Sequence, residues 1–208
     1  MHDKQSLKKS LGALGIEATD IQLQLSLDYL AVLKKWNTVH NLTRIDAHKQ
    51  FDLHIVDSLS IHRLCQGSHI LDVGSGAGLP GIPLSIFFPE KKFYLLDSNQ
   101  KKSIFTKYAA SKLGLSNVIS VHSRVEEYKS EHQFQTILSR AFASTNKFIN
   151  SCGHLLAKDG KLIAMKGQIS EEPENDLPLG FHLEACIPLV VPGVESRHAA
   201  IICRAEES

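Results

Sequence analysis

The glycine-rich segment at residues 70–81, ILDVGSGAGLPG, constrains the fold of this chain more than any other feature. It opens with a short apolar run that leads to Asp72, a pattern typical of a buried strand in a parallel sheet. Three glycines then follow at alternate positions, Gly74, Gly76 and Gly78. Glycine has no Cβ and adopts positive φ without strain, so this turn can bring its backbone against a ligand. Leu79 and the residues after it are expected to begin a helix, with Pro83 in its first turn.

The rest of the chain alternates between apolar strands and helical stretches. Strands are expected at 69–73, 93–97, 117–122, 134–139 and 160–165, with helices at 80–88, 99–114 and 144–156. Later strands at 181–191 and 198–204 would complete an open, mostly parallel α/β sheet of about seven strands, the Rossmann-like class. Two helices are expected before the sheet, at 20–36 with Asp20 as N-cap and at 47–64. We therefore divide the chain into an N-terminal helical cap, residues 1–65, and an α/β domain, residues 66–208.

Ligands of such sheets bind at the carboxyl ends of the strands, so Asp72 and the glycine turn mark the expected binding site. A carboxylate at this position disfavours phosphates and suits a ligand with an amino group and a positive centre, such as S-adenosylmethionine. The next apolar run ends at Asp97, 21 residues after Gly76, the spacing expected for an acid that accepts hydrogen bonds from ribose hydroxyls. NAD carries the same ribose, so Asp97 fits either cofactor.

The register of the glycines distinguishes these two cofactors. Residues 76–81 spell G-x-G-x-x-G, but in a dinucleotide site the first glycine closely follows the strand. That register begins at Gly74 and places Leu79 where the third glycine should stand. The pattern D-x-G-x-G-x-G instead uses every residue from Asp72 to Gly78 and favours S-adenosylmethionine over NAD. An NAD-dependent oxidoreductase is retained as an alternative, as is a glycine turn without a ligand.

Residues after the third and fourth strands complete the expected site. Val125 and Glu126 follow the third strand, where an adenine would lie, although Glu126 could instead cap a helix. The segment SRAFA at 139–143 has neither the Asn/Asp-Pro-Pro-aromatic turn of enzymes that methylate exocyclic amines nor a cysteine for covalent attack. A ring nitrogen as nucleophile would need positioning more than a base. Arg140 and Arg197 are the candidate catalytic residues, suited to a base edge or a phosphate, or alternatively to a structural ion pair.

Composition limits the expected partners and compartment. The net charge of +1 does not indicate a nucleic-acid binder, but six lysines lie between residues 91 and 112, a face that could meet phosphate or simply be solvated. No apolar run approaches the ~20 residues of a membrane span, and the N-terminus lacks the apolar region of a signal peptide. The cysteines show no metal-binding spacing. We expect a cytoplasmic protein with no metal site, in which His48, His54 and His62 are core or surface residues.

Several segments make the chain resemble the bacterial small-subunit ribosomal RNA methyltransferase G family, historically called glucose-inhibited division protein B. In order they are WN at 36–37, NLT at 41–43, HIVDSL at 54–59, DVGSGAGLPGIPL at 72–84, LDS at 96–98, KK at 101–102, SRVEE at 123–127, SRAFA at 139–143 and MKG at 165–167. The LPGIPL extension and the SRAFA turn are far more specific than the glycine loop alone.

This resemblance implies a class I methyltransferase that moves a methyl group from S-adenosylmethionine to guanine N7 in the helix 18 loop of 16S rRNA. Matching positions imply donor contacts at Gly74, Leu79, Val125, Glu126 and Arg140, to which the residue arguments add Asp72, Gly76, Gly78 and Asp97. The predicted RNA-binding residues are Arg124, Arg197, Lys101, Lys102 and Lys166. We expect a monomer that acts on naked rRNA, the 30S subunit or an assembly intermediate. A non-catalytic ribosome assembly module and a small-molecule methyltransferase are further alternatives.

Overall fold

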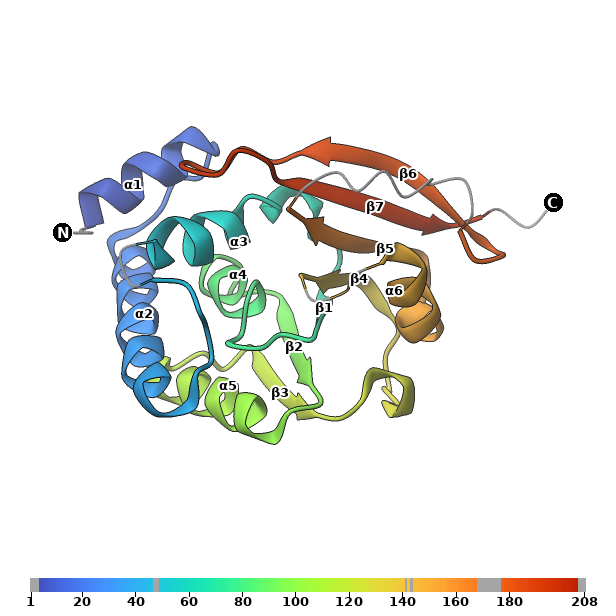
Figure 1. Cartoon of the computed structure of the whole chain (residues 1–208), viewed down its shortest axis with the longest axis horizontal. Helices are drawn as coiled ribbons and strands as arrows, with labels where there is room; N and C mark the ends of the chain where they lie inside the picture. The colour runs from blue at the N-terminus through green and yellow to red at the C-terminus, as the bar shows by residue number, and fades with distance from the viewer. Residues whose placement is uncertain (1–3, 47–48, 141, 143, 168–176, 206–208) are drawn as a thin grey trace.

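One mixed sheet organises the chain (Figure 1). The computed structural model describes residues 4–46, 49–140, 142, 144–167 and 177–205. In these residues seven strands follow the order β3-β2-β1-β4-β5-β7-β6. They are β1 (His69–Val73), β2 (Lys92–Asp97), β3 (Val118–His122), β4 (Phe134–Ser139), β5 (Leu156–Lys166), β6 (Phe181–Pro188) and β7 (His198–Arg204). Strands β1 to β5 pair in parallel and β7 pairs antiparallel with both β5 and β6, which confirms the predicted class.

Helices cover both faces of this sheet (Figure 1). They are α1 (Lys4–Ala13), α2 (Asp20–His40), α3 (Asp57–Leu59), α4 (Gly81–Phe87), α5 (Gln100–Leu113) and α6 (Thr145–Cys152). The alternation of side chains along β1 supplies two cores, one on each face. Ile70 belongs to the core shared with α2, α4 and α5, whereas Leu71 and Val73 belong to the core shared with α6.

The helix predicted at 20–36 is α2, and it continues to His40. Its N-cap is Thr19 rather than the predicted Asp20. The Thr19 hydroxyl accepts a hydrogen bond from the backbone N–H of Gln22, and the Gln22 side-chain oxygen accepts one from the Thr19 N–H. This reciprocal capping box satisfies two N–H groups that lack partners within the helix.

The helix predicted at 47–64 is broken into three kinds of turn. A π-helix, η1 (Phe51–Val56), leads into the single turn of α3 and then into a 3₁₀ turn, η2 (His62–Leu64). The sequence predicts an apolar stripe along this segment, and its members are all buried: Phe51, Ile55, Leu59 and Ile61. π-Helical turns occur frequently at functional sites, and this one carries His54 and ends beside Asp57.

Other boundaries differ by a few residues from those predicted. The helix predicted at 144–156 ends at Cys152 and is followed by a 3₁₀ turn, η4 (Gly153–Leu155), and the strand predicted to reach residue 191 ends at Pro188. A further 3₁₀ turn, η3 (Val125–Glu127), follows β3. The sequence also predicts a loop or a poor helix at the acidic, proline-bearing residues 173–178, which lie outside the described residues except for 177 and 178. None of the described helices combines the length and apolar character that a bilayer crossing requires.

The helical cap and the sheet share one apolar core. Leu7 of α1, Leu23 of α2 and Ile70 of β1 belong to the same cluster of buried side chains. α1 had not been predicted, since its only buried side chains are two leucines, Leu7 and Leu11. The boundary between residues 65 and 66 therefore remains a proposal. It marks a change in the type of secondary structure, and the apolar core continues across it.

Candidate functional site

The turn after β1 has the backbone that its glycines predict. The φ angles of Gly74, Gly76 and Gly78 are 69°, 58° and 82°. The Gly74 amide continues the sheet and donates to the carbonyl of Leu96 at 2.8 Å. A Cβ on Gly78 would lie 2.5 Å from Cδ1 of Ile82 in α4. The turn can therefore pack this closely on α4 only because Gly78 has no side chain.

Asp72 lies beneath this turn and is fully buried. Its Oδ2 accepts a hydrogen bond from the backbone N–H of Gly81 at 2.8 Å, while Oδ1 has no partner among the described residues. Burial raises the pKa of the Asp72 carboxyl to about 7, an effect that the Gly81 hydrogen bond and the nearby positive charge of Arg140 partly offset. Asp72 lines neither of the cavities described below, so any effect on a ligand there acts through the glycine turn or through its charge.

Asp97 joins the glycine turn to the start of α5. Its Oδ2 accepts from the backbone N–H of Gly76 at 2.9 Å, and its Oδ1 accepts from the N–H of Asn99 at 2.8 Å. The ammonium of Lys102 lies 3.8 Å from the same Oδ2. The acid predicted to bind a ribose thus also fixes the backbone on which a ligand would rest.

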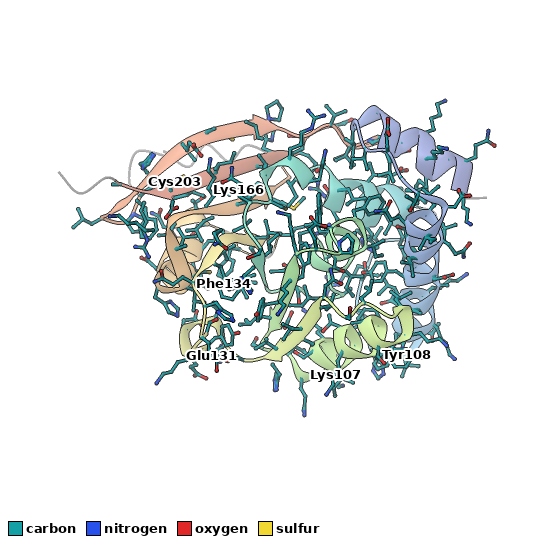
Figure 2. All side chains as sticks on the ribbon, turned by 180° about the vertical axis from the view of Figure 1, so that it is seen from behind. Lys107, Tyr108, Glu131, Phe134, Lys166 and Cys203 are labelled. Carbon is teal, nitrogen blue, oxygen red and sulfur yellow. The ribbon has the colours of Figure 1, made fainter. Side chains whose placement is uncertain are left out.

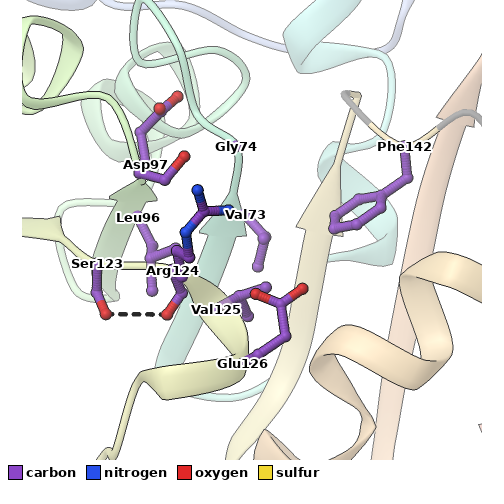
Figure 3. Close-up of a pocket in the computed structure, with 10 residues that line it drawn as sticks. Val73, Gly74, Leu96, Asp97, Ser123, Arg124, Val125, Glu126 and Phe142 are labelled. Atoms are coloured by element: carbon purple, nitrogen blue, oxygen red, sulfur yellow. Dashed lines mark hydrogen bonds between the residues drawn. The ribbon is translucent and has the colours of Figure 1, made fainter.

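A first cavity lies at the carboxyl ends of β1, β2 and β3 (Figure 3). Its lining residues are Val73, Gly74, Leu96, Asp97, Ser98, Ser123, Arg124, Val125, Glu126 and Phe142. Three strand ends thus bring together predicted residues from three separate segments. Phe142 had not been singled out, although its SRAFA segment had been.

Two charged residues flank Val125 in this cavity. The Glu126 carboxylate accepts from the Ser151 hydroxyl at 2.9 Å, and hydrogen bonds from its own backbone N–H and from Ser151 lower the pKa of Glu126. Figure 3 shows the Arg124 side chain between Asp97 and Val125. Arg124, predicted to contact RNA, therefore also lines the cavity predicted for the donor.

A second cavity adjoins the first, and Gly74 lines both. Its lining residues are Leu42, Thr43, Ile45, His54, Gly74, Ser75, Gly76, Ala77, Leu79 and Arg140. The cap supplies the first four of these, the glycine turn the next five, and the end of β4 the last. The predicted donor residues Leu79 and Arg140 face this second cavity and not the first.

His54 is a buried, uncharged histidine in the wall of the second cavity. Its Nδ1 lies 3.2 Å from the Leu53 carbonyl and so carries the proton, which leaves Nε2 to accept from the Thr43 hydroxyl at 3.2 Å. Burial and the charge of Arg140 lower the pKa of His54 to about 4. The expectation of a core histidine is confirmed, but its place in a cavity had not been predicted.

The two candidate catalytic arginines meet at one buried acid of the cap, Asp57. Arg140 donates from Nη1 to Oδ2 of Asp57 at 2.8 Å, and Arg197 donates from Nε to Oδ1 at 2.9 Å. Both arginines therefore form an ion pair with Asp57, and their roles toward the donor and the RNA stay predictions. Arg140 in addition lines the second cavity, whereas Arg197 lines neither cavity. Asp57 had not been assigned a role, although it lies in the HIVDSL segment.

The lysines predicted to meet RNA come from two different elements. Lys101 and Lys102 lie in the first turn of α5, next to Asp97, whereas Lys166 is the last residue of β5. Figure 2 shows Lys166 far from Lys107, which also belongs to α5. Lys91 has a structural role, since its ammonium donates to the backbone carbonyls of residues 65 and 67 at 3.1 and 2.8 Å.

The cap also holds the glycine turn directly. The buried hydroxyl of Tyr29 in α2 donates to the Ala77 carbonyl at 2.7 Å. Asn37 of α2 fixes the cap loop on the other side of the second cavity, because its amide donates to the Thr43 carbonyl at 2.9 Å and its oxygen accepts from the Thr43 N–H at 2.8 Å. Both walls of this cavity are therefore attached to one helix.

Comparisons with known proteins agree with this geometry. Residues 22–202 match the family model described as rRNA small subunit methyltransferase G. A protein named ribosomal RNA small subunit methyltransferase G from Marinobacter nauticus is 44% identical over 202 residues, covering 96% of this chain and 94% of that protein. One of the same name from Shewanella sp. (strain MR-7) is 44% identical over 194 residues, covering 92% and 94%. A solved structure of a SAM-dependent methyltransferase from Aquifex aeolicus shares the fold, with TM-score 0.58, 17% identity and coverage of 78% and 96%.

The sheet order, the glycine turn and the adjoining cavities define a class I S-adenosylmethionine-dependent methyltransferase. The match over residues 22–202 and the identity to both relatives show more. The chain belongs to the rRNA small subunit methyltransferase G family. This confirms the resemblance and the expected cofactor, and it rules out an NAD-dependent oxidoreductase.

Proposed function

We propose that the chain transfers the methyl group of S-adenosylmethionine to N7 of a guanine in the helix 18 loop of 16S rRNA. The observation that carries the proposal is the meeting of two cavities at Gly74, one suited to adenosine and one lined by Arg140 and an uncharged His54. The name of the family supports small-subunit rRNA as the substrate. The motifs shared with that family support guanine N7 as the acceptor atom.

The first cavity fits the donor. Both oxygens of Asp97 are held by backbone N–H groups, and each retains a lone pair that can accept from a ribose hydroxyl. Val125 offers a buried apolar wall for an adenine. Beneath the turn, the buried Asp72 carboxyl has one oxygen without a partner among the described residues, and its ionised form would match the ammonium and sulfonium charges of the ligand. When bound, S-adenosylmethionine supplies a methyl group that is already activated by its positive sulfur.

The second cavity suits a nucleophile that needs no deprotonation. Its described lining includes no carboxylate, thiol or lysine, and His54, with a pKa of about 4, is a weak base. Guanine N7 carries a free lone pair, so the residues of the chain would act by orientation. Arg140 can donate to guanine O6 or to a neighbouring phosphate. Positioning of this kind can lower an activation barrier by roughly 7–11 kcal/mol.

Cations near the carboxyl ends of the strands support contact with RNA phosphate. Lys101 and Lys102 lie at the start of α5, Arg124 lies at the rim of the first cavity, and Lys166 ends β5. Phosphate contacts release counterions, so RNA affinity should fall steeply with increasing salt. A ribosomal substrate supports a cytoplasmic location.

The direct test supplies purified protein with labelled S-adenosylmethionine and 30S subunits that lack the modification, and then maps the labelled nucleotide. We expect label on N7 of one guanine in the helix 18 loop. Naked 16S rRNA and assembly intermediates, tested in parallel, identify the preferred form of the substrate. Label at another nucleotide would refute the assignment of the acceptor. Donor binding with no label on any of these substrates would favour a non-catalytic assembly module.

A further inference from the structure

Asp57 joins three parts of the chain that are distant in sequence. It begins α3 in the helical cap and is fully buried, with Arg140 from the end of β4 on one oxygen and Arg197 from the segment before β7 on the other. Nη1 of Arg140 also donates to the carbonyl of Leu53 at 3.3 Å. We call Asp57, Arg140 and Arg197 the arginine clamp. The cap carboxylate therefore determines where both guanidinium groups lie.

The clamp carries a net charge of +1, because one carboxylate lies between two guanidinium groups. Both guanidinium side chains are partly exposed, at 23% for Arg140 and 26% for Arg197, while Asp57 is wholly shielded from water. Interactions of a buried charge are screened less than those of exposed charges. Arg140 lines the cavity where the sulfonium of the donor would meet the acceptor. Without the Asp57 carboxylate, no negative charge in the clamp would offset the two arginines, and a positively charged donor would have to bind close to them.

We propose that Asp57 is a positioning residue that holds Arg140 in the second cavity and offsets its charge, so that this cavity accepts a sulfonium cation. Arg197 holds Asp57 from the opposite side and acts through it, without touching the donor. This inference rests on the proposed function only in its placement of the donor, and not on the identity of the RNA.

A comparison of two ligands isolates the charge effect. S-adenosylhomocysteine lacks the transferred methyl group and has an uncharged sulfur, but otherwise matches S-adenosylmethionine. The ratio of the two affinities therefore reports the electrostatic environment of the sulfur and cancels general damage to the binding site. Both affinities are measured by isothermal titration on the purified full chain, without RNA.

Four variants are compared, and two of them should move this ratio in opposite directions. Asp57→Asn should reduce the affinity for S-adenosylmethionine relative to S-adenosylhomocysteine on the order of tenfold, the effect of one unit charge about 10 Å away at an effective dielectric constant of about 20. Arg197→Gln should shift the ratio the opposite way, because the Asp57 charge is then less offset. The double variant has the wild-type net charge, so its ratio should return toward the wild-type value. Arg197→Lys, which retains the charge, should also keep a ratio close to wild type.

Folding controls separate this role from a structural one. Removing one partner of a buried ion pair is destabilising, so the melting temperature of each variant is measured alongside its ligand affinities. Glu184→Gln is the matched control, since it removes one carboxylate from the ion pair with Lys161, at 2.6 Å, outside both cavities. This control should leave the affinity ratio unchanged. If Asp57→Asn does not fold, Arg197→Gln and Arg197→Lys carry the test.

The outcomes separate the clamp from the proposed function. An unchanged ratio in Asp57→Asn and Arg197→Gln, with normal binding by the wild type, would overturn the clamp and leave the methyl transfer proposal standing. Equal losses for both ligands would assign Asp57 a purely structural role and also overturn it. If the wild type bound neither ligand, the donor site itself would be refuted.

Discussion

The buried carboxyl of Asp72 should make the free energy of unfolding depend on pH, and this dependence can be tested sharply. Because burial raises its pKa from 3.8 to about 7, the folded protein holds a proton there that the unfolded chain has already released. Stability is therefore lost as pH rises between these two values, the sign expected when the native state binds more protons. Asp72→Asn removes this titration and retains an oxygen that can accept from the Gly81 N–H.

The magnitude follows from the shift. The interval from pH 5 to pH 7 spans about 2 units and lies between the pKa of Asp72 in the unfolded chain and its pKa in the folded protein. Each unit is worth about 1.4 kcal/mol, so wild-type stability should fall by about 3 kcal/mol relative to the variant over this interval. In the variant, the asparagine NH₂ group takes the place of an oxygen that has no partner among the described residues, and burying it costs about 1–3 kcal/mol at every pH. We therefore expect the stability of Asp72→Asn relative to the wild type to increase from pH 5 to pH 7, and the variant to be the more stable protein at pH 8.

Urea unfolding of the ligand-free protein at pH 5, 6, 7 and 8 provides the measurement. The difference in free energy of unfolding between wild type and Asp72→Asn cancels the other titrating groups, and Asp28→Asn on the exposed face of α2 serves as the control. A difference that stays constant over this range would refute the reasoning. In addition, S-adenosylmethionine should release a proton from the wild type near pH 7, because a cation favours ionised Asp72. Titration calorimetry in two buffers of different ionisation enthalpy detects that proton.

Two further substitutions test how the glycine turn is held. Gly78→Ala should cost about 1–3 kcal/mol more than Gly114→Ala, because both residues have positive φ but only Gly78 places its new Cβ against Ile82; equal losses in urea unfolding would contradict this account. Tyr29→Phe removes the hydroxyl that donates to Ala77 and should lower the free energy of unfolding by about 1–3 kcal/mol. It should also speed hydrogen exchange of the loop amides, and unchanged exchange would argue against an anchoring role.

Residues that share the carboxyl edge of the sheet could be predicted from local patterns. Gly74, Asp97 and Val125 each follow a recognisable strand, and parallel strands bring such ends to one edge whatever the details of packing. The fold class followed from the same alternation of strands and helices. The capping box at Thr19 and Gln22 is likewise a local signal, because a threonine is followed three residues later by a glutamine, although the predicted N-cap was Asp20.

The contacts between cap and sheet could not be predicted in this way. The pairs Arg140–Asp57, Arg197–Asp57 and Tyr29–Ala77 are separated by 83, 140 and 48 residues. The π-turn before Asp57 adds to the difficulty, because an apolar stripe alone does not reveal a change in hydrogen-bond register. Local sequence thus determined the strands, the glycine turn and the acids at their ends, since these depend on backbone preference and periodicity. Tertiary structure alone decided which charges meet in the interior, since only docking of the cap on the sheet removes Asp57 from water and leaves two arginines as its partners.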